Sequence, residues 1–307
     1  MTSRSTGPTG PTELPARLNR LLGDSGDGGD GGGAVGRIDD LGVSHEWTLH
    51  RATLADGRTA FVKAAALPGG VGGVFAAEAA GLRWLGEAAG APVPDVLAVD
   101  EETLVLSWLP AESATPRAAE RFGRELAAMH AAGAGSYGAP WPGFIAELPL
   151  DNAPAESWPE WYATRRILPF LRSAGAAAAL SPGDVRLVEQ VTDDITALAG
   201  PAEPPSRIHG DLWSGNVLWS AGRGWLIDPA AHGGHRETDL AMLALFGAPH
   251  LERIIAAYQE VTPLADGWRA RVPLHQLHPL LVHVALYGAS YRARTVEAAR
   301  AALAAST

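Results

Sequence analysis

Residues 208–219, IHGDLWSGNVLW, decide how this 307-residue chain is interpreted. They place His209, Asp211 and Asn216 in the spacing H-x-D-x-x-x-x-N. Asp228 follows twelve residues after Asn216, at the end of the apolar run WLI, which predicts a strand that ends in a carboxylate. Carboxylate and carboxamide oxygens are hard ligands that suit Mg²⁺, so Asn216 and Asp228 are the predicted metal ligands. Asp211 is left to act as a base.

A second pair of charged residues lies far upstream. Lys63 is the only lysine among 24 basic residues, and it ends the apolar strand-like run FVK; Glu78 follows 15 residues later in a helical stretch. An ammonium is a compact point charge and a guanidinium is a planar fork, so the two differ most inside a tight phosphate site. In kinase-like phosphotransferases, a lysine on a strand contacts the phosphates of ATP and a glutamate on the next helix holds that lysine in place. Lys63 and Glu78 fit these two positions. The sequence therefore predicts phosphoryl transfer from Mg²⁺-bound ATP to a hydroxyl oriented by Asp211.

The periodicity around these residues predicts an α+β, two-lobed, protein-kinase-like fold. Residues 35–109 form the expected N-lobe, which would bind the nucleotide. It consists of a small five-stranded antiparallel β-sheet and one helix at 74–89. Residues 110–307 form the expected C-lobe, which is larger, mainly helical, and carries the catalytic and metal loops. Residues 1–34 are rich in glycine and proline and are expected to be a flexible tail, with a short helix from Glu13 to Leu22. The expected C-lobe helices cover residues 115–132, 157–174 and 182–198, and helices resume from 237.

Composition excludes several classes of protein. The absence of cysteine excludes disulfides, zinc–thiolate sites and thiol nucleophiles. A net charge of −10 argues against binding to nucleic acid, which requires a basic surface. No window holds 18 uninterrupted apolar residues and the N-terminus lacks the apolar core of a signal peptide. We therefore expect no membrane partner and a cytoplasmic location.

Longer motifs carry a resemblance to one family. HGDLWSGN at 209–216 and DPAAHGGHRETDLAM at 228–242 closely resemble the fructosamine kinase (ketosamine-3-kinase) family, and the likeness extends over roughly residues 35–305. It implies phosphorylation by ATP of the 3-hydroxyl of a ketosamine, the adduct of a sugar and an amine. The phosphorylated product is unstable and releases the amine, which implies deglycation of small amines or protein lysines. Bacterial-type members are thought to prefer ribulosamines and erythrulosamines over fructosamines.

Further roles follow from position within these motifs. Trp213 would form a wall of the sugar pocket and attract a nearby amine through a cation–π contact, the alternative being a tryptophan packed beneath the loop. His235 and Glu237 would either contact the substrate or brace the metal loop. His209 would brace the catalytic loop, and Asp239 would cap its helix or hold the loop backbone.

The expected nucleotide contacts are less regular. Gly42 and Ser44 lie in the stretch DDLGVSHEW (39–47), which would cover the nucleotide although it contains no run of glycines. Ser107, Trp108 and Leu109 would form the hinge between the lobes, where backbone groups pair with adenine; simple packing is the alternative for Trp108. Phosphate contacts are therefore expected from Gly42 and from donors at Ser44 and beyond.

Other functions remain open on the sequence alone. The same core supports kinases of aminoglycoside, choline or homoserine type, because a fold does not fix the substrate. A polycationic aminoglycoside favours a dense acidic cluster, whereas the acidic residues between 140 and 200 include the scattered Glu147, Asp151, Glu156 and Glu160. A catalytically silent nucleotide-binding protein would be expected to have lost at least one residue of the phosphoryl-transfer pattern. All four are present here: Lys63, Asp211, Asn216 and Asp228. The sequence is compatible with a monomer or a homodimer.

Overall fold

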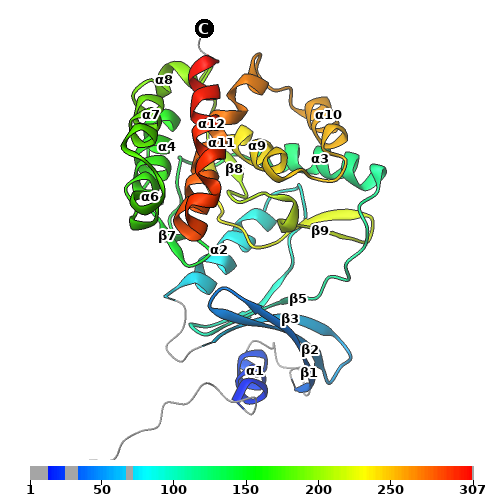
Figure 1. Ribbon diagram of the computed structural model, residues 1–307. Helices are drawn as coiled ribbons and strands as arrows, with labels where there is room; N and C mark the ends of the chain where they lie inside the picture. Colours follow the sequence, from blue (N-terminus) through cyan, green and yellow to red (C-terminus); the bar gives the residue numbers. More distant parts are fainter. Residues whose placement is uncertain (1–12, 25–33, 67–71, 306–307) are drawn as a thin grey trace, which may run out of the picture.

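The N-terminal strands form one antiparallel sheet in the order β1-β2-β3-β5-β4, as the alternating sequence predicts (Figure 1). The computed structural model describes residues 13–24, 34–66 and 72–305. One face of the sheet packs against the single helix α2, where Phe75 and Leu82 meet Trp47 and Leu104. The elements are β1 (Val35–Ser44), β2 (Trp47–Leu54), β3 (Thr59–Ala65), α2 (Val74–Gly86), β4 (Val96–Val99) and β5 (Thr103–Ser107).

Helix α1 (Glu13–Asp24) covers the opposite face of this sheet (Figure 1). Leu18 is fully buried there with Val62 and Val105. The side chain of Asn19 accepts a hydrogen bond from the backbone N–H of Val35, at 2.7 Å, which fixes the start of β1. Part of the segment that we predicted as a flexible tail is therefore a layer of the N-lobe, because its leucines are spaced to bury one helix face. The remainder of that tail, residues 1–12 and 25–33, lies outside the described residues.

The C-lobe is mainly helical and begins with α3, whose first turn is capped by the Thr115 hydroxyl accepting from the N–H of Ala118. Its helices are α3 (Pro116–Ala131), α4 (Trp158–Tyr162), a π-helical turn (Ala163–Ile167), α5 (Leu168–Leu171), α6 (Ala174–Ala179), α7 (Pro182–Asp193), α8 (Ile195–Leu198), α9 (Arg236–Phe246), α10 (Leu251–Val261), α11 (Trp268–Tyr287) and α12 (Arg292–Ala304), with 3₁₀ turns at Ser214–Asn216 and Gly288–Tyr291. Its short strands are β6 (Gly143–Ile145), β7 (Leu148–Leu150), β8 (Ser206–Ile208), β9 (Val217–Ser220), β10 (Arg223–Leu226) and β11 (His232–Gly234).

Two expected helices are interrupted. The helix predicted at 157–174 contains the π-helical turn and ends before Ser173, whose hydroxyl caps α6 by accepting from the N–H of Ala176. The helix predicted at 182–198 breaks at Asp194, where φ and ψ are −91° and 2°. The β6–β7 hairpin was not predicted, because strands of three residues carry almost no periodic signal.

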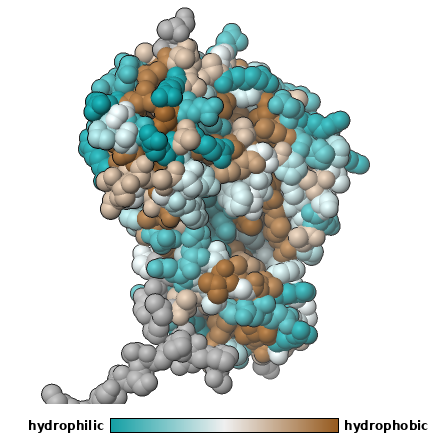
Figure 2. All heavy atoms as spheres, viewed as in Figure 1, coloured by the Kyte–Doolittle hydropathy of each residue, from teal (hydrophilic) through white to brown (hydrophobic). Residues whose placement is uncertain are grey.

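The two lobes meet at a narrower waist, and hydrophilic and hydrophobic residues are interspersed over the visible face of both (Figure 2). None of the helices in the described ranges combines the length and the hydropathy needed to cross a bilayer.

Candidate active site

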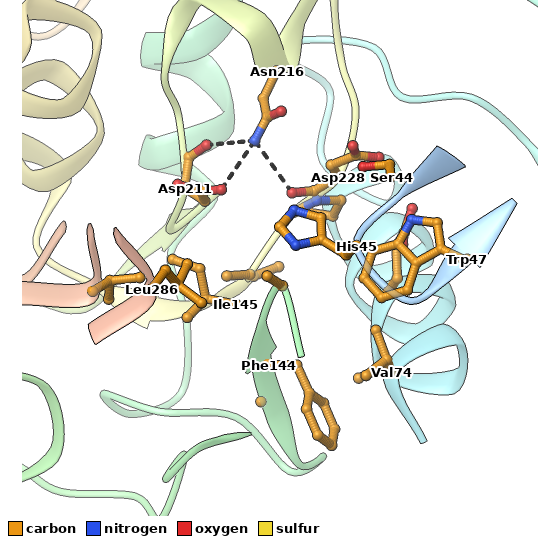
Figure 3. Close-up of a pocket in the computed structure, with 18 of the residues that line it drawn as sticks. Ser44, His45, Trp47, Val74, Phe144, Ile145, Asp211, Asn216, Asp228 and Leu286 are labelled. Atoms are coloured by element: carbon orange, nitrogen blue, oxygen red, sulfur yellow. Dashed lines mark hydrogen bonds between the residues drawn. The ribbon is translucent and has the colours of Figure 1, made fainter. Parts of the chain in front are cut away.

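The catalytic loop joins β8 to β9 and brings Asp211 and Asn216 together (Figure 3). The Asn216 side-chain amide donates to the backbone oxygen of Asp211 at 2.8 Å and to its carboxylate at 3.1 Å. The same amide lies 3.5 Å from the backbone oxygen of Asp228. Because the amide nitrogen of Asn216 is engaged in this way, its side-chain oxygen is left as a ligand atom. The spacing H-x-D-x-x-x-x-N thus corresponds to one connected loop.

Asp228 follows β10 in an unusual backbone conformation. Its φ is +54°, in the left-handed region that non-glycine residues rarely occupy. Such strain persists where the surroundings fix the chain, and it is concentrated at functional sites. The Asp228 side chain is 47% exposed and lines the cavity between the lobes.

Lys63 joins the two halves of the sequence pattern. Its ammonium lies 2.8 Å from both carboxylate oxygens of Glu78 and 2.6 Å from Asp228 Oδ1, although the side chain is only 3% exposed. Burial opposes the charge on Lys63, but the carboxylates of Asp228 and Glu78 outweigh it and raise the lysine pKa. Burial also acts to raise the pKa of Asp228, and the Lys63 ammonium reverses this so that the net shift is downward. The ion pair therefore holds a cation beside the predicted metal ligand.

The close contacts of Lys63 make the Lys63→Arg variant informative. A guanidinium is broader than an ammonium and cannot place one nitrogen against three carboxylate oxygens in the same buried volume. We expect the KM for ATP to rise at least about tenfold, equivalent to about 1.4 kcal/mol of binding free energy. Steady-state kinetics with varied Mg²⁺-bound ATP measure this. An unchanged KM would show that the single lysine of this arginine-rich chain is not required for binding the phosphates of ATP.

Asp211 lies in an environment that disfavours its charge. Burial raises the pKa of Asp211 to about 8, and the negative charge of Asp228 acts in the same direction, partly opposed by the hydrogen bond from Asn216. A group whose pKa lies near neutrality is suited to accept and return a proton under physiological conditions.

These groups face one cavity of about 240 Å³ between the lobes (Figure 3). Seven of the residues predicted from sequence line it: Ser44, Lys63, Glu78, Asp211, Trp213, Asn216 and Asp228. The lining also contains residues that sequence reasoning missed, among them Phe144 and Ile145 of β6 and His283, Leu286 and Tyr287 of α11. Phe144 and Ile145 lie in the stretch GFIAELPLDN (143–152), in which no local pattern indicates that they line this cavity.

Trp213 lies at the edge of the cavity and is 40% exposed, so it is not a core tryptophan. Its ring meets Phe246 edge-on at 6.1 Å. A Cβ at Gly215 would lie 2.2 Å from the Trp213 ring, so only glycine at that position leaves room for the indole. The loop sequence therefore presents an aromatic surface two residues from the predicted base.

The predicted hinge residues and Gly42 are not among the described residues that line this cavity. Ser107 ends β5, and the N–H of Trp108 donates to the backbone oxygen of Thr59 at 3.3 Å. The guanidinium of Arg51 lies 4.8 Å from the Trp108 ring centroid, which accounts for this side chain by packing. The backbone N–H groups of Ser107 and Trp108 are therefore both engaged within the N-lobe, the former with the backbone oxygen of Asp95 at 2.9 Å. A role for other backbone groups of Ser107, Trp108 and Leu109 in binding adenine stays a prediction.

A buried hydrogen-bond network supports the catalytic loop. The Asp239 carboxylate, fully buried, accepts from the backbone N–H groups of His209 and Gly210 at 2.8 and 2.9 Å and lies 3.1 Å from His130 Nε2. His209 Nδ1 accepts from the N–H of Asp211 at 3.2 Å, and its Nε2 lies 2.9 Å from the backbone oxygen of Ile227. Burial lowers the pKa of His209, which favours the neutral ring. Its two nitrogens thus link Asp211 in the catalytic loop to Ile227, the residue before Asp228.

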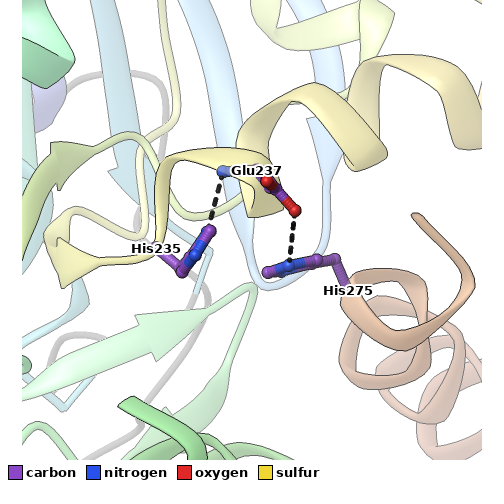
Figure 4. A group of neighbouring side chains, drawn as sticks. All are labelled: His235, Glu237 and His275. Carbon is purple, nitrogen blue, oxygen red and sulfur yellow. Dashed lines mark hydrogen bonds and ion pairs between the residues drawn. The ribbon is translucent and has the colours of Figure 1, made fainter. Parts of the chain in front are cut away.

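His235 and Glu237 are not among the described residues that line this cavity, and they lie beside His275 (Figure 4). Of the two roles expected for them, this position favours bracing over contact with substrate. Both residues are buried, and Arg271 donates to the two Glu237 oxygens at 2.5 and 2.9 Å. His275 Nε2 lies 3.4 Å from Glu237 Oε2. Burial acts to raise the pKa of Glu237, but the nearby His275 and the hydrogen bonds from Arg271 outweigh it and lower the pKa to about 2. Because Arg271 already supplies the positive charge, this group braces α9 against α11 and is poorly suited to a metal ion.

His232 makes the folded state sensitive to acid. Burial, with the nearby charge of Arg166, lowers the pKa of His232 to about 3 from 6.5. Below pH 6.5 the unfolded chain binds a proton that the folded protein excludes, so this residue lowers the free energy of unfolding as pH falls. At pH 5 the loss is about 2 kcal/mol. His232→Asn keeps a donor for the backbone oxygen of Ala230 and does not titrate. Urea unfolding of both proteins at pH 7 and pH 5 measures the effect. Between these pH values the free energy of unfolding of the variant should fall by about 2 kcal/mol less than that of the wild type. Equal pH slopes in the two proteins would contradict the assignment.

Comparison with known proteins identifies the family of this chain. The family model described as fructosamine kinase matches residues 42–305. A probable ketoamine kinase of Thermus thermophilus is 36% identical over 220 residues, which cover 71% of this chain and 79% of the relative. The crystal structure of a candidate fructosamine-3-kinase from Thermobifida fusca has a TM-score of 0.90 and 56% identity, over 96% of this chain and all of that one.

A structure with much lower sequence identity shares the same fold. A thermostable mutant of the aminoglycoside phosphotransferase APH(4)-Ia, solved with ADP and hygromycin B, has a TM-score of 0.59 and 16% identity over 88% of this chain and 95% of that one. At this identity the likeness concerns the fold alone, and it confirms the two-lobed kinase-like architecture expected from sequence. The family match spans most of the sequence and both lobes, and the chain belongs to the fructosamine kinase family.

Proposed function

We propose that this chain uses Mg²⁺-bound ATP to phosphorylate the 3-hydroxyl of a ketosamine. The observation that carries the proposal is one cavity lined by Asp211, Trp213 and Asp228 together with the Lys63–Glu78 pair. Membership of a family of ATP-dependent phosphotransferases supplies the class of reaction. The residues that line the cavity include candidates for binding the phosphates, for holding Mg²⁺ and for accepting the proton of the hydroxyl.

The phosphate and metal groups fit their proposed roles. Lys63, held by Glu78, would contact the phosphates of ATP. Asn216 and Asp228 would hold Mg²⁺, since one presents a free carboxamide oxygen and the other an exposed carboxylate. The bound ion would neutralise negative charge on the phosphates. Lys63 would exchange its contact with Asp228 for phosphate when the nucleotide binds.

Asp211 would act on the acceptor. In its ionised form it would take the proton of the 3-hydroxyl as that oxygen bonds to the γ-phosphorus and the bond to ADP breaks. Asn216 would keep the carboxylate oriented through its amide. His209 and Asp239 would act only as positioning residues, because they contact the loop and not the cavity.

The lining of the cavity favours a ketosamine over an aminoglycoside. Among the described lining residues the acidic ones are Glu78, Asp211 and Asp228, and each already has a role in phosphoryl transfer. A polycationic aminoglycoside would leave its ammonium groups without carboxylate partners. A sugar carrying one amine requires instead an apolar face and an aromatic ring, which Trp213 provides. Decay of the 3-phosphate would then free the amine, which would make the reaction a deglycation step.

The proposal is tested by ATP consumption with ribulose-, erythrulose- and fructose-lysine adducts, and with aminoglycosides and choline as controls. We expect turnover on at least one ketosamine and none on the controls. Asp211→Asn serves as the inactive reference. Turnover restricted to a control alcohol would leave the kinase fold intact but overturn the proposed substrate.

A further inference from the structure

Two hairpin turns from different lobes meet at the edge of the cavity. The β1–β2 turn consists of His45 and Glu46, and the β6–β7 turn consists of Ala146 and Glu147. His45 Nδ1 lies 3.2 Å from Glu147 Oε2, and the two side chains are 33% and 37% exposed. His45 and Ala146 both line the cavity, and the His45 ring projects toward it between Asp228 and Trp47 (Figure 3).

Both turns hold a non-glycine residue in a left-handed conformation. His45 has a φ of +53° and Ala146 a φ of +50°, each at the first position of a two-residue hairpin turn. Glycine or asparagine is the usual choice at such positions, since a Cβ costs free energy there. The chain therefore places an imidazole at a position where local backbone preference favours glycine. A glycine at this position could not make the contact with Glu147.

Each turn is anchored to its own lobe. On the N-lobe side, the backbone oxygen of Glu46 accepts from the N–H of Ala66 at 2.9 Å, and the His45 ring lies 5.3 Å from the Trp47 ring. On the C-lobe side, Asn152 closes the base of the β6–β7 hairpin by donating to the backbone oxygen of Trp141 at 3.3 Å. The buried guanidinium of Arg166 donates to the Asn152 side chain at 2.6 Å. The His45–Glu147 contact thus joins two supported structures.

We propose that the His45–Glu147 pair is an interlobe clasp that positions the nucleotide-covering turn, a role that rests on the proposed use of ATP. The turn has no run of glycines and follows Ser44, so its position over the phosphates depends on contacts from outside the loop. Glu147 supplies such a contact from the C-lobe. Closure of the turn then restricts how ATP phosphates sit against Lys63.

A double-mutant cycle measures the clasp. His45→Ala, Glu147→Ala and the double variant are titrated with Mg²⁺-bound ADP by calorimetry. Since the pair is partly exposed, we expect each single variant to weaken ADP binding about two- to fivefold. The double variant should be no weaker than the weaker single variant, because the two side chains act through one contact. Glu147→Gln keeps an acceptor oxygen and should retain more affinity than Glu147→Ala.

Controls separate the clasp from other effects. Glu101→Ala removes the same charge from an exposed position between β4 and β5, away from the cavity lining, and should leave ADP binding within twofold of wild type. Unchanged affinity in both single variants, or single effects that multiply in the double variant, would overturn the clasp. So would lower melting temperatures accompanied by normal ADP affinity. Coupled loss of ADP binding in a protein that phosphorylates no ketosamine would support the clasp and reject the proposed substrate.

Discussion

Replacing Asp211 by asparagine is expected to lower kcat by about 10²–10⁴-fold while nucleotide binding survives. Asparagine has nearly the same shape, and Asn216 can still donate to the backbone oxygen of residue 211 at the observed 2.8 Å. The carboxamide cannot take a proton from the attacking hydroxyl, so the loss falls on the chemical step. The residues proposed to hold the phosphates and Mg²⁺, namely Lys63, Asn216 and Asp228, are unchanged in this variant.

Single-turnover kinetics with saturating ATP and ketosamine measure this loss directly, and calorimetry with ADP measures the nucleotide affinity. Asp193→Asn is a matched control, because it makes the same chemical change at an exposed position at the end of α7. It should retain wild-type kcat. If Asp211→Asn keeps more than about a tenth of the wild-type rate, another group accepts the proton, and the role of Asp211 is wrong.

The second large effect concerns stability. We expect Glu237→Gln to lower the free energy of unfolding by about 3–5 kcal/mol, because it leaves the buried charge of Arg271 without its carboxylate. Arg271 is 8% exposed and would keep its contacts with the backbone oxygens of Ala265 and Asp266, together with at most the hydrogen bond to the one remaining side-chain oxygen at position 237. Urea unfolding at pH 7 measures the change.

Glu252→Gln is the matched control for this experiment. Glu252 lies 3.8 Å from Arg269 in a pair whose side chains are 85% and 66% exposed, so its loss should cost less than about 1 kcal/mol. The KM for the ketosamine in the Glu237→Gln protein, measured where it is folded, should stay near wild type. A large rise in that KM with normal stability would restore Glu237 to the substrate site.

The parts of the fold that were predictable are those with local signals. Alternation predicted the five strands, and the single lysine with Glu78 indicated the ion pair that the structure contains. The spacing of Asp211, Asn216 and Asp228 indicated one loop cluster because short turns leave few ways to connect them.

The parts that were not predictable depend on tertiary packing. Leu18 is buried because α1 lies across the outer face of the sheet, and glycine- and proline-rich flanks concealed this. His235 and Glu237 follow Asp228 closely in sequence, which left contact with substrate and bracing as alternatives. At the N-terminus of α9, Glu237 pairs with Arg271 and the His235 ring packs against Trp158 and His275. Ile145 and Tyr287 enter the cavity from segments more than a hundred residues apart, so no local pattern could have placed them together.

The most direct test is the site of phosphorylation on a ketosamine. Purified protein, Mg²⁺-bound ATP and ribulosyl-lysine are incubated together, and the product is analysed by phosphorus–proton NMR, with the 3-deoxy analogue as a parallel substrate. We expect one phosphate, attached at O3, and no turnover of the 3-deoxy analogue. Phosphate at another oxygen, or equal turnover of the 3-deoxy analogue, would contradict this expectation.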